Sequence, residues 1–145
     1  MADVFDRPTR SRVMAAIRGR NTSPELVVRR FLHAQGLRFR LHVRHLPGRP
    51  DIVLHARRTV IFVHGCFWHR HVGCRFAVLP RTNSAFWQTK LEGNRARDRR
   101  NAIRLRRAGW RVLTIWECDL KERGLARLLR KINARLPARG RLRLA

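Results

Sequence analysis

The sequence has no long hydrophobic run, few cysteines and few acidic residues. No stretch of its 145 residues approaches the roughly eighteen consecutive apolar residues of a membrane-spanning helix. The opening residues MADVFDRPTRSR include no apolar stretch, so no secretory signal is expected. Three cysteines, an odd number, favour metal binding or free thiols over a disulfide framework. We therefore expect a cytoplasmic protein that has no contact with membranes.

The scarcity of acidic side chains leaves a large positive charge. Nine Asp and Glu residues stand against 34 Lys and Arg residues, which gives a formal net charge of +25 at pH 7. A field of this size attracts polyanions and steers their association. We expect nucleic acid as the partner and a nucleoid-associated location. Because ribosomal and histone-like proteins share such a charge, it does not by itself indicate an enzyme.

The length fits one domain with loosely composed ends. We expect a basic N-terminal arm over 1–20, a folded domain over 21–136 and a basic C-terminal tail over 137–145. Hydrophobic periodicity and turn residues predict the elements inside these limits. They are a short arm helix at 9–17, helices at 23–36, 84–108 and 120–136, strands at 37–43, 51–55, 59–63 and 111–117, and an irregular stretch at 64–83. This order predicts an α/β domain with a small mixed sheet flanked by helices.

Potential metal ligands gather in the irregular stretch. Cys66, His71 and Cys74 fall within nine residues, and Cys118 follows the last predicted strand. A Cys₃His set is typical of a closed tetrahedral zinc site, which would stabilise a 20-residue loop that lacks secondary structure. The alternative is three unrelated buried thiols and a surface histidine, because cysteine often packs as a small hydrophobic residue.

Carboxylates and histidines gather around the predicted hairpin. Asp51 opens one strand, where a carboxylate can hold a divalent cation beside a phosphate. His64 ends the partner strand and His69 follows five residues later, so either could transfer a proton near Asp51. Glu25 lies in the first turn of a helix that Ser23 is expected to cap, and it could reach a metal-bound water. Taken singly, each residue also has a plainer role, as a turn residue, a surface or core histidine, or a helix-dipole partner.

Two aromatic pairs flank this polar region. They are Phe67 with Trp68, and Phe86 with Trp87. Apolar side chains can enter a base step of DNA, and the bend that results recruits further contacts. Core packing is the commoner role, but adjacent residues cannot easily face one core, so we expect one member of each pair to be exposed. We assign Trp110 and Trp116 to the core.

The chain resembles the Vsr mismatch endonucleases of very short patch repair, most specifically in the run HGCFWHRHVGC at 64–74. The similarity covers residues 1 to about 135, including LPGRPDIV (46–53), FWQTKLEGNRARDRR (86–100) and GWRVLTIWEC (109–118). It implies a restriction-endonuclease-like fold with a structural zinc loop. The implied activity is Mg²⁺-dependent nicking of double-stranded DNA on the 5′ side of the mispaired thymine in a T·G mismatch, the product of 5-methylcytosine deamination.

The resemblance also implies roles for individual residues. Asp51 and the backbone carbonyl of Val63 would ligate Mg²⁺. His69, assisted by His64, would transfer a proton near the scissile phosphate, and Glu25 would orient metal-bound water. The implied structural Zn²⁺ ligands are Cys66, His71, Cys74 and Cys118. The implied DNA-binding residues are an intercalating wedge of Phe67, Trp68 and Trp87, with Met14, Lys90 and Asn94 contacting the mismatch.

Two other interpretations stay open at this point. The chain could be a restriction or homing-type nuclease of the same fold with another specificity, or a non-catalytic, zinc-stabilised protein that binds nucleic acid. Mg²⁺-dependent nicking of a T·G duplex separates an enzyme from a binding protein, and activity on fully paired DNA favours the restriction type. We expect a monomer, with a MutL-type repair protein as a candidate partner.

Overall fold

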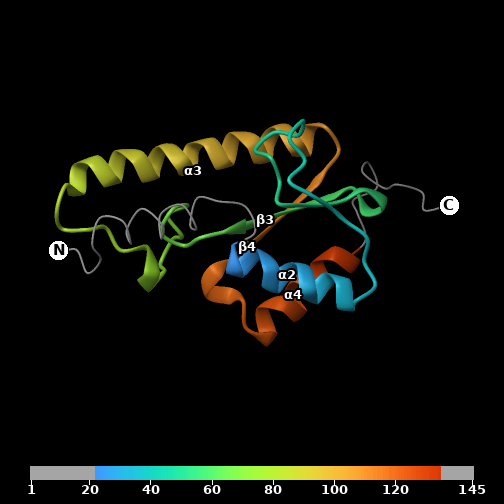
Figure 1. Cartoon of the computed structure of the whole chain (residues 1–145). Coiled ribbons are helices and arrows are strands. Elements are labelled where there is room, and N and C mark those ends of the chain that lie inside the picture. Colours follow the sequence, from blue (N-terminus) through green and yellow to red (C-terminus); the bar gives the residue numbers. More distant parts are fainter. Residues whose placement is uncertain (1–21, 135–145) are drawn as a thin grey trace.

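Helices cover both faces of one four-stranded sheet in the computed structural model, which describes residues 22–134 (Figure 1). The helices are α2 (Ser23–Ala34), α3 (Ser84–Arg107) and α4 (Glu122–Asn133). The strands are β1 (Arg40–Leu41), β2 (Ile52–Leu54), β3 (Thr59–His64) and β4 (Arg111–Trp116). Single turns of 3₁₀ helix are η1 (His55–Arg57), η2 (Arg75–Ala77) and η3 (Glu117–Asp119). Within the described part of the chain, no helix is both long and apolar enough to cross a membrane.

Some predictions fall outside the described residues. These are the arm helix at 9–17, the contact residue Met14 and the tail at 137–145. The division into arm, domain and tail therefore stays a prediction.

The strands form a mixed sheet, as predicted, and their order in the sheet is β1-β2-β3-β4. β1 pairs with β2 and β2 with β3 in antiparallel fashion, whereas β3 pairs with β4 in parallel. A parallel pair needs a long crossover, and here the irregular stretch and α3 supply it. The parallel register aligns the ends of β3 and β4, where His64 lies opposite Trp116. Residues that follow the two strands are thereby brought together.

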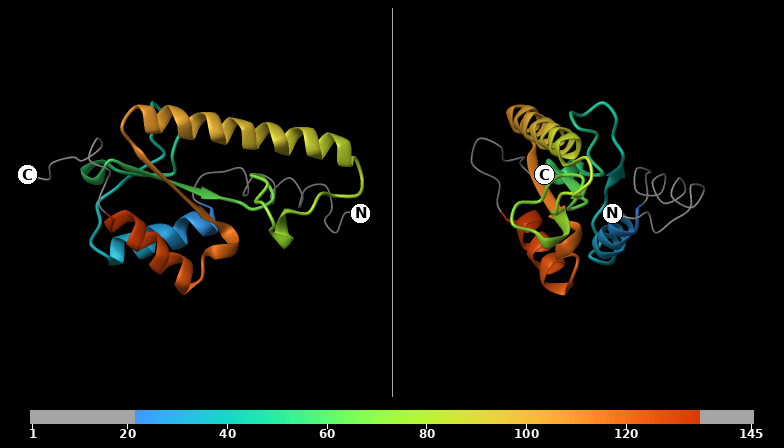
Figure 2. Two further views of the ribbon diagram at one scale, coloured as in Figure 1. Left: turned by 180° about the vertical axis from the view of Figure 1, so that it is seen from behind. Right: turned by 90° about the vertical axis from the view of Figure 1, so that its left-hand side faces the viewer.

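Alternation along the strands divides the core into two layers. One layer lies between the sheet and the pair α2 and α4, and Figure 2 shows these helices opposite α3 in both views. Its buried residues are Val28, Leu32, Ile52, Leu54, Ile61, Leu113, Ile115, Leu128 and Ile132. The other layer lies under α3 and contains Val53, Val60, Leu105 and Trp110. Each buried aliphatic side chain contributes about 1.5–3 kcal/mol, so burial on both faces holds even short strands in place.

The predicted strand at 37–43 is wrong in extent, because only Arg40–Leu41 pair with β2. His42 adopts a left-handed backbone conformation, with φ 49°, and this ends the strand. Leu37 and Phe39 pack against the larger core layer without pairing. Their alternation therefore reflects burial and not a hydrogen-bonded ladder.

Two helix starts also differ from expectation. α2 begins at Ser23, but its cap residue is Thr22, which has an extended backbone and makes no side-chain capping bond, so the predicted cap was wrong. α4 begins at Glu122, later than predicted, because η3 precedes it. Gly124 packs directly against η3, where an added Cβ would overlap the carbonyl oxygen of Asp119. A residue with a side chain could not allow this close approach.

Candidate active site and metal centre

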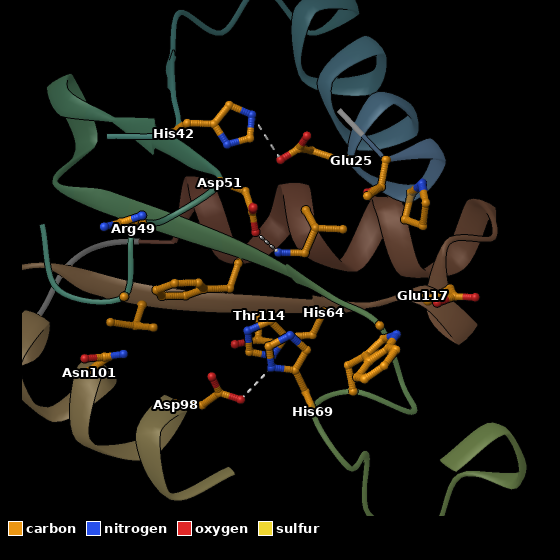
Figure 3. A pocket seen from close by; sticks show the side chains of 18 of the residues that line it. Glu25, His42, Arg49, Asp51, His64, His69, Asp98, Asn101, Thr114 and Glu117 are labelled. Carbon is orange, nitrogen blue, oxygen red and sulfur yellow. Dashed lines mark hydrogen bonds and ion pairs between the residues drawn. The ribbon is translucent and has the colours of Figure 1, made fainter. Parts of the chain in front are cut away.

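One open cleft of about 1320 Å³ collects side chains from α2, β3, α3 and the loops beside the sheet (Figure 3). All four predicted catalytic residues line it: Glu25, Asp51, His64 and His69. Val63, the implied carbonyl ligand, also lines the cleft. The sequence analysis missed two further lining residues, His42 and Asp98. The fold thus brings the candidate catalytic residues together from distant parts of the chain.

Asp51 lies at the entrance to β2, opposite β3. Its Oδ2 accepts a hydrogen bond of 2.8 Å from the backbone N–H of Val63. Burial, together with the hydrogen bond and charge of Glu25, raises the pKa of Asp51 to about 7, against the lowering effect of the Val63 N–H. Two adjacent buried carboxylates favour either a shared proton or a bound cation.

Glu25 is buried in the first turn of α2, with 2% of its surface exposed. Arg29, one turn later, donates a 2.9 Å hydrogen bond to Oε2, and Nε2 of His42 lies 3.5 Å from Oε1. This carboxylate is therefore not a surface partner of the helix dipole. Ligand atoms of Glu25, His42 and Asp51 all lie within 4.8 Å of one another, so the three side chains could hold one metal ion.

The two predicted catalytic histidines stack on each other. The ring centroids of His64 and His69 are 3.7 Å apart and the rings are nearly parallel. Burial, followed by the charge of His69, lowers the pKa of His64 to about 3, so His64 is neutral near pH 7. Within residues 22–134 its buried Nδ1 has no hydrogen-bond partner.

Asp98 on α3 contacts the ring of His69 at Nδ1. The distance between Nδ1 of His69 and Oδ2 of Asp98 is 2.6 Å, and each side chain is 29% exposed (Figure 3). The carboxylate fixes the proton on Nδ1 and leaves Nε2 free to accept one. An acidic residue inside the basic run RARDRR was the signal in the sequence that could have revealed Asp98.

The four predicted metal ligands Cys66, His71, Cys74 and Cys118 form one cluster, with ligand atoms within 4.8 Å of one another. The parallel pairing of β3 with β4 explains why the distant Cys118 joins: its backbone N–H lies 3.4 Å from the sulfur of Cys66. Burial raises the pKa of Cys66 to about 12, whereas a backbone hydrogen bond at Phe76 lowers the pKa of Cys74. Three sulfurs and one imidazole could hold a metal ion, and their proximity favours this interpretation over unrelated thiols.

Trp116 belongs to this cluster and not to the core. It is half-buried, and its ring stacks on His71 with centroids 4.0 Å apart and an interplanar angle of 5°. The core assignment was therefore wrong for Trp116. For Trp110, which is 7% exposed, it is confirmed.

The predicted wedge residues form one aromatic cluster. Phe67 lies 5.2 Å from Trp68 and 5.5 Å from Trp87, measured between ring centroids. Trp87 also contacts Phe86, which is 59% exposed. The expectation of one exposed member is confirmed for Phe86 and Trp87 but is wrong for the first pair, because Phe67 and Trp68 are both half-buried.

The two implied mismatch-contacting residues that the structure describes border this cluster. Nζ of Lys90 lies 6.0 Å from the ring of Trp68 and 5.8 Å from that of Trp87. Nδ2 of Asn94 donates a 3.0 Å hydrogen bond to the backbone oxygen of Trp68. Both residues come from α3, which therefore supports the aromatic cluster and, through Asp98, the candidate catalytic histidine.

Comparison with known proteins identifies the family. The sequence model described as DNA mismatch endonuclease Vsr matches residues 2–75. The Type II nicking enzyme V.XorIIP of Xanthomonas oryzae pv. oryzae is 49% identical over 124 residues, or 86% of this chain and 90% of that protein. The DNA mismatch endonuclease Vsr of Escherichia coli (strain K12) is 50% identical over 123 residues, or 85% and 78%. The chain belongs to the Vsr family.

A third relative extends the same pattern. The Type II nicking enzyme V.NmeAIP of Neisseria meningitidis is 42% identical over 127 residues, or 88% of this chain and 90% of that protein. The predicted family is thus confirmed, and with it the prediction of a DNA endonuclease that hydrolyses phosphodiester bonds. The interpretation as a non-catalytic binding protein is wrong.

Proposed function

We propose that the protein nicks duplex DNA on the 5′ side of the mispaired thymine in T·G mismatches, in a reaction that depends on Mg²⁺. The observation that carries this proposal is one cleft lined by Asp51, His69 and Trp68. A buried carboxylate, a histidine held for proton transfer and an aromatic side chain able to stack on a base therefore face the same space. The wider proposal includes a restriction-endonuclease-like fold and mismatches that arise from deaminated 5-methylcytosine.

The residues at Asp51 fit a hard divalent cation. Two carboxylates buried side by side are costly unless a proton or a cation compensates them. Asp51, with the Val63 carbonyl that the family resemblance adds, would hold Mg²⁺, and Glu25 would orient its water. When bound, Mg²⁺ supplies Lewis-acid stabilisation of the phosphate charge and lowers the pKa of its water.

Proton transfer is assigned to His69. Asp98 holds the proton on Nδ1 of His69, so Nε2 can accept the proton of an attacking water. His64 is neutral near pH 7 and stacks on the ring of His69, so it acts as a positioning residue. The proposal thus makes His69 the dominant proton-transfer residue.

Two further parts of the proposal concern the metal cluster and the surroundings of the mismatch. The Cys66, His71, Cys74 and Cys118 cluster would hold a structural Zn²⁺, because its donor set is typical of closed zinc sites. Phe67, Trp68 and Trp87 would enter the duplex, with Lys90 and Asn94 beside the mismatch. A cytoplasmic monomer that works with a MutL-type partner stays a prediction.

A panel of labelled duplexes tests the proposed function. With Mg²⁺, we expect a single nick in the thymine strand of the T·G duplex and a 5′-phosphate product, and no nick in C·G, T·A or other mismatched duplexes. Several flanking sequences should be tried, because flanking bases can influence recognition. Equal cleavage of fully paired DNA would favour the restriction type, and full activity without a divalent cation would refute the metal dependence.

Substitution of Trp68 tests the wedge. Trp68→Ala should weaken binding to the T·G duplex more than binding to the C·G duplex. A mismatched pair costs less free energy to open, so insertion of the ring contributes more to binding there. The substitution should cost less stability than the about 3–5 kcal/mol typical of a core tryptophan, because the ring is half-buried. Melting temperatures and dissociation constants for both duplexes measure the two effects.

Trp110→Ala is the matched control for this substitution. Trp110 is 7% exposed and lies in the core layer under α3, so its truncation should lower the melting temperature strongly and leave the preference for T·G unchanged. If Trp68→Ala behaves like this control, Trp68 is a core residue and the wedge must be made by other aromatic side chains.

A further inference from the structure

His42 lies in the cleft and has no role in the function proposed above. It follows β1 directly, and its backbone N–H donates a 3.1 Å hydrogen bond to the backbone oxygen of Asp51. The side chain is 19% exposed and points toward Glu25 (Figure 3). The backbone bond thus keeps position 42 beside the candidate metal ligands, whichever side chain it carries.

The contacts of the ring show that its Nε2 presents a lone pair. Nη2 of Arg29 lies 3.0 Å from Nε2 of His42 and 2.9 Å from Oε2 of Glu25. A guanidinium group can only donate hydrogen bonds, so Nε2 must accept this one and the ring proton sits on Nδ1. An imidazole in this tautomer is in the form that binds metal ions.

The donors around Asp51 therefore include a nitrogen. Ligand atoms of Glu25, His42 and Asp51 lie within 4.8 Å of one another. We propose that His42 is a nitrogen ligand of the cation in this cleft, which makes the site favour a first-row transition cation such as Mn²⁺ over Mg²⁺. Carboxylates and water suit Mg²⁺, whereas an imidazole nitrogen raises affinity for transition metals along the series from Mn²⁺ to Ni²⁺. This inference rests on the proposed metal-dependent function. It adds a nitrogen ligand to the proposed Mg²⁺ site and concerns the relative affinity of that site for the two cations.

The arrangement of the Glu25 carboxylate allows the cation to enter. Arg29 contacts Oε2, while His42 faces Oε1. Arg29 would release Nε2 of His42 and keep its bond to Oε2, so the positive charge of the cation would take the place of one guanidinium contact. The competing explanation is a structural one, in which His42 only bridges α2 to the loop after β1.

Mn²⁺ binding to the zinc-loaded protein separates the two explanations. Pulsed electron paramagnetic resonance of the Mn²⁺-bound wild type should show coupling to one imidazole nitrogen, and His42→Gln should remove that coupling. Loss of a residue that merely supports a metal ligand lowers affinity by about 10–100-fold, so losing a ligand should weaken Mn²⁺ binding at least about tenfold. Mg²⁺ binding, which gains little from nitrogen, should change far less.

Two variants control the experiment. Glutamine at position 42 can still bridge Arg29 and Glu25 by hydrogen bonds. If His42 only bridges these residues, His42→Gln should bind Mn²⁺ as tightly as the wild type. His45→Ala removes an exposed histidine from the same loop and should behave like the wild type. Persistent nitrogen coupling in His42→Gln would overturn the inference alone. Failure of the wild type to bind Mn²⁺ or Mg²⁺ would overturn it together with the metal dependence of the proposed function.

Discussion

Asp51→Asn is expected to abolish nicking of the T·G duplex while DNA binding stays largely intact. The substitution removes the charged oxygen that would hold the cation, and metal catalysis supplies several kcal/mol of transition-state stabilisation. That corresponds to a loss of about 10³-fold or more in turnover, because each 1.36 kcal/mol is tenfold. Affinity for DNA comes mainly from the positively charged surface, which the substitution does not reduce. Single-turnover nicking and a binding titration measure the two quantities separately.

The same substitution should make the metal-free protein more stable at high pH. Burial raises the pKa of Asp51 from 3.8 to about 7. Between these values the unfolded chain has lost the proton and the folded protein still holds it, so the free energy of unfolding falls as pH rises through this window. Asparagine cannot ionise, so the variant avoids this loss. Its melting temperature should exceed that of the wild type at about pH 8 and approach it below about pH 4.

The melting comparison needs Mg²⁺-free buffer that contains enough Zn²⁺ to occupy the proposed site in the cysteine cluster. Glu122→Gln is a suitable control, because it removes one negative charge from an exposed residue in the first turn of α4. It should leave nicking unchanged and show no comparable gain in stability at high pH. Wild-type turnover in Asp51→Asn would refute the role of Asp51 as a ligand. If Asp51→Asn and the wild type have the same melting temperature at high pH, ionisation of Asp51 does not destabilise the folded protein and its pKa is not raised by burial.

The sequence predicted the residues that local patterns bring together. The hairpin of β2 and β3 places the carboxylate of Asp51 beside the backbone N–H of Val63, and the hairpin followed from two short apolar runs around a turn. The Cys66, His71 and Cys74 group followed from close spacing alone. Cys118 was reached only because it follows a strand, and the parallel alignment of β3 with β4 is what brings it to the cluster.

The residues that sequence reasoning missed depend on tertiary structure. His42 lies in a segment whose alternation predicted a continuous strand, but its left-handed backbone ends the strand and its side chain contacts Glu25 and Arg29 of α2. Asp98 lies among arginines on a helix, and nothing in that run shows that one helix face meets His69. The low pKa of His64 likewise comes from burial that no local pattern encodes. Contacts between distant elements decide all three cases.

Loss of the metal from the cysteine cluster is expected to unfold much of the domain. In zinc-dependent peptides, metal binding contributes an apparent 10–16 kcal/mol, roughly, while whole domains are stable by only about 5–15 kcal/mol. The loop at 65–83 has one 3₁₀ turn, η2, as its only regular element. The cluster joins this loop to the ends of β3 and β4, and Trp116 stacks on one of the proposed ligands, His71. Without the metal, the loop would keep its contacts with α3 through Trp68 and His69 but would lose its link to the ends of β3 and β4.

Metal analysis of the purified protein should therefore find one Zn²⁺ per chain, and His71→Ala should lower both the zinc content and the melting temperature. His33→Ala is the matched control, because that histidine is exposed near the end of α2. Among the three cysteines, Cys66→Ser should lower the melting temperature most, since Cys66 is 2% exposed and its sulfur contacts the backbone of Cys118. A zinc-free protein with wild-type melting would refute the structural metal. If Cys118→Ser alone keeps both zinc and stability, the ligands are confined to the loop, and the contact between β3 and β4 holds the cluster without a fourth metal bond.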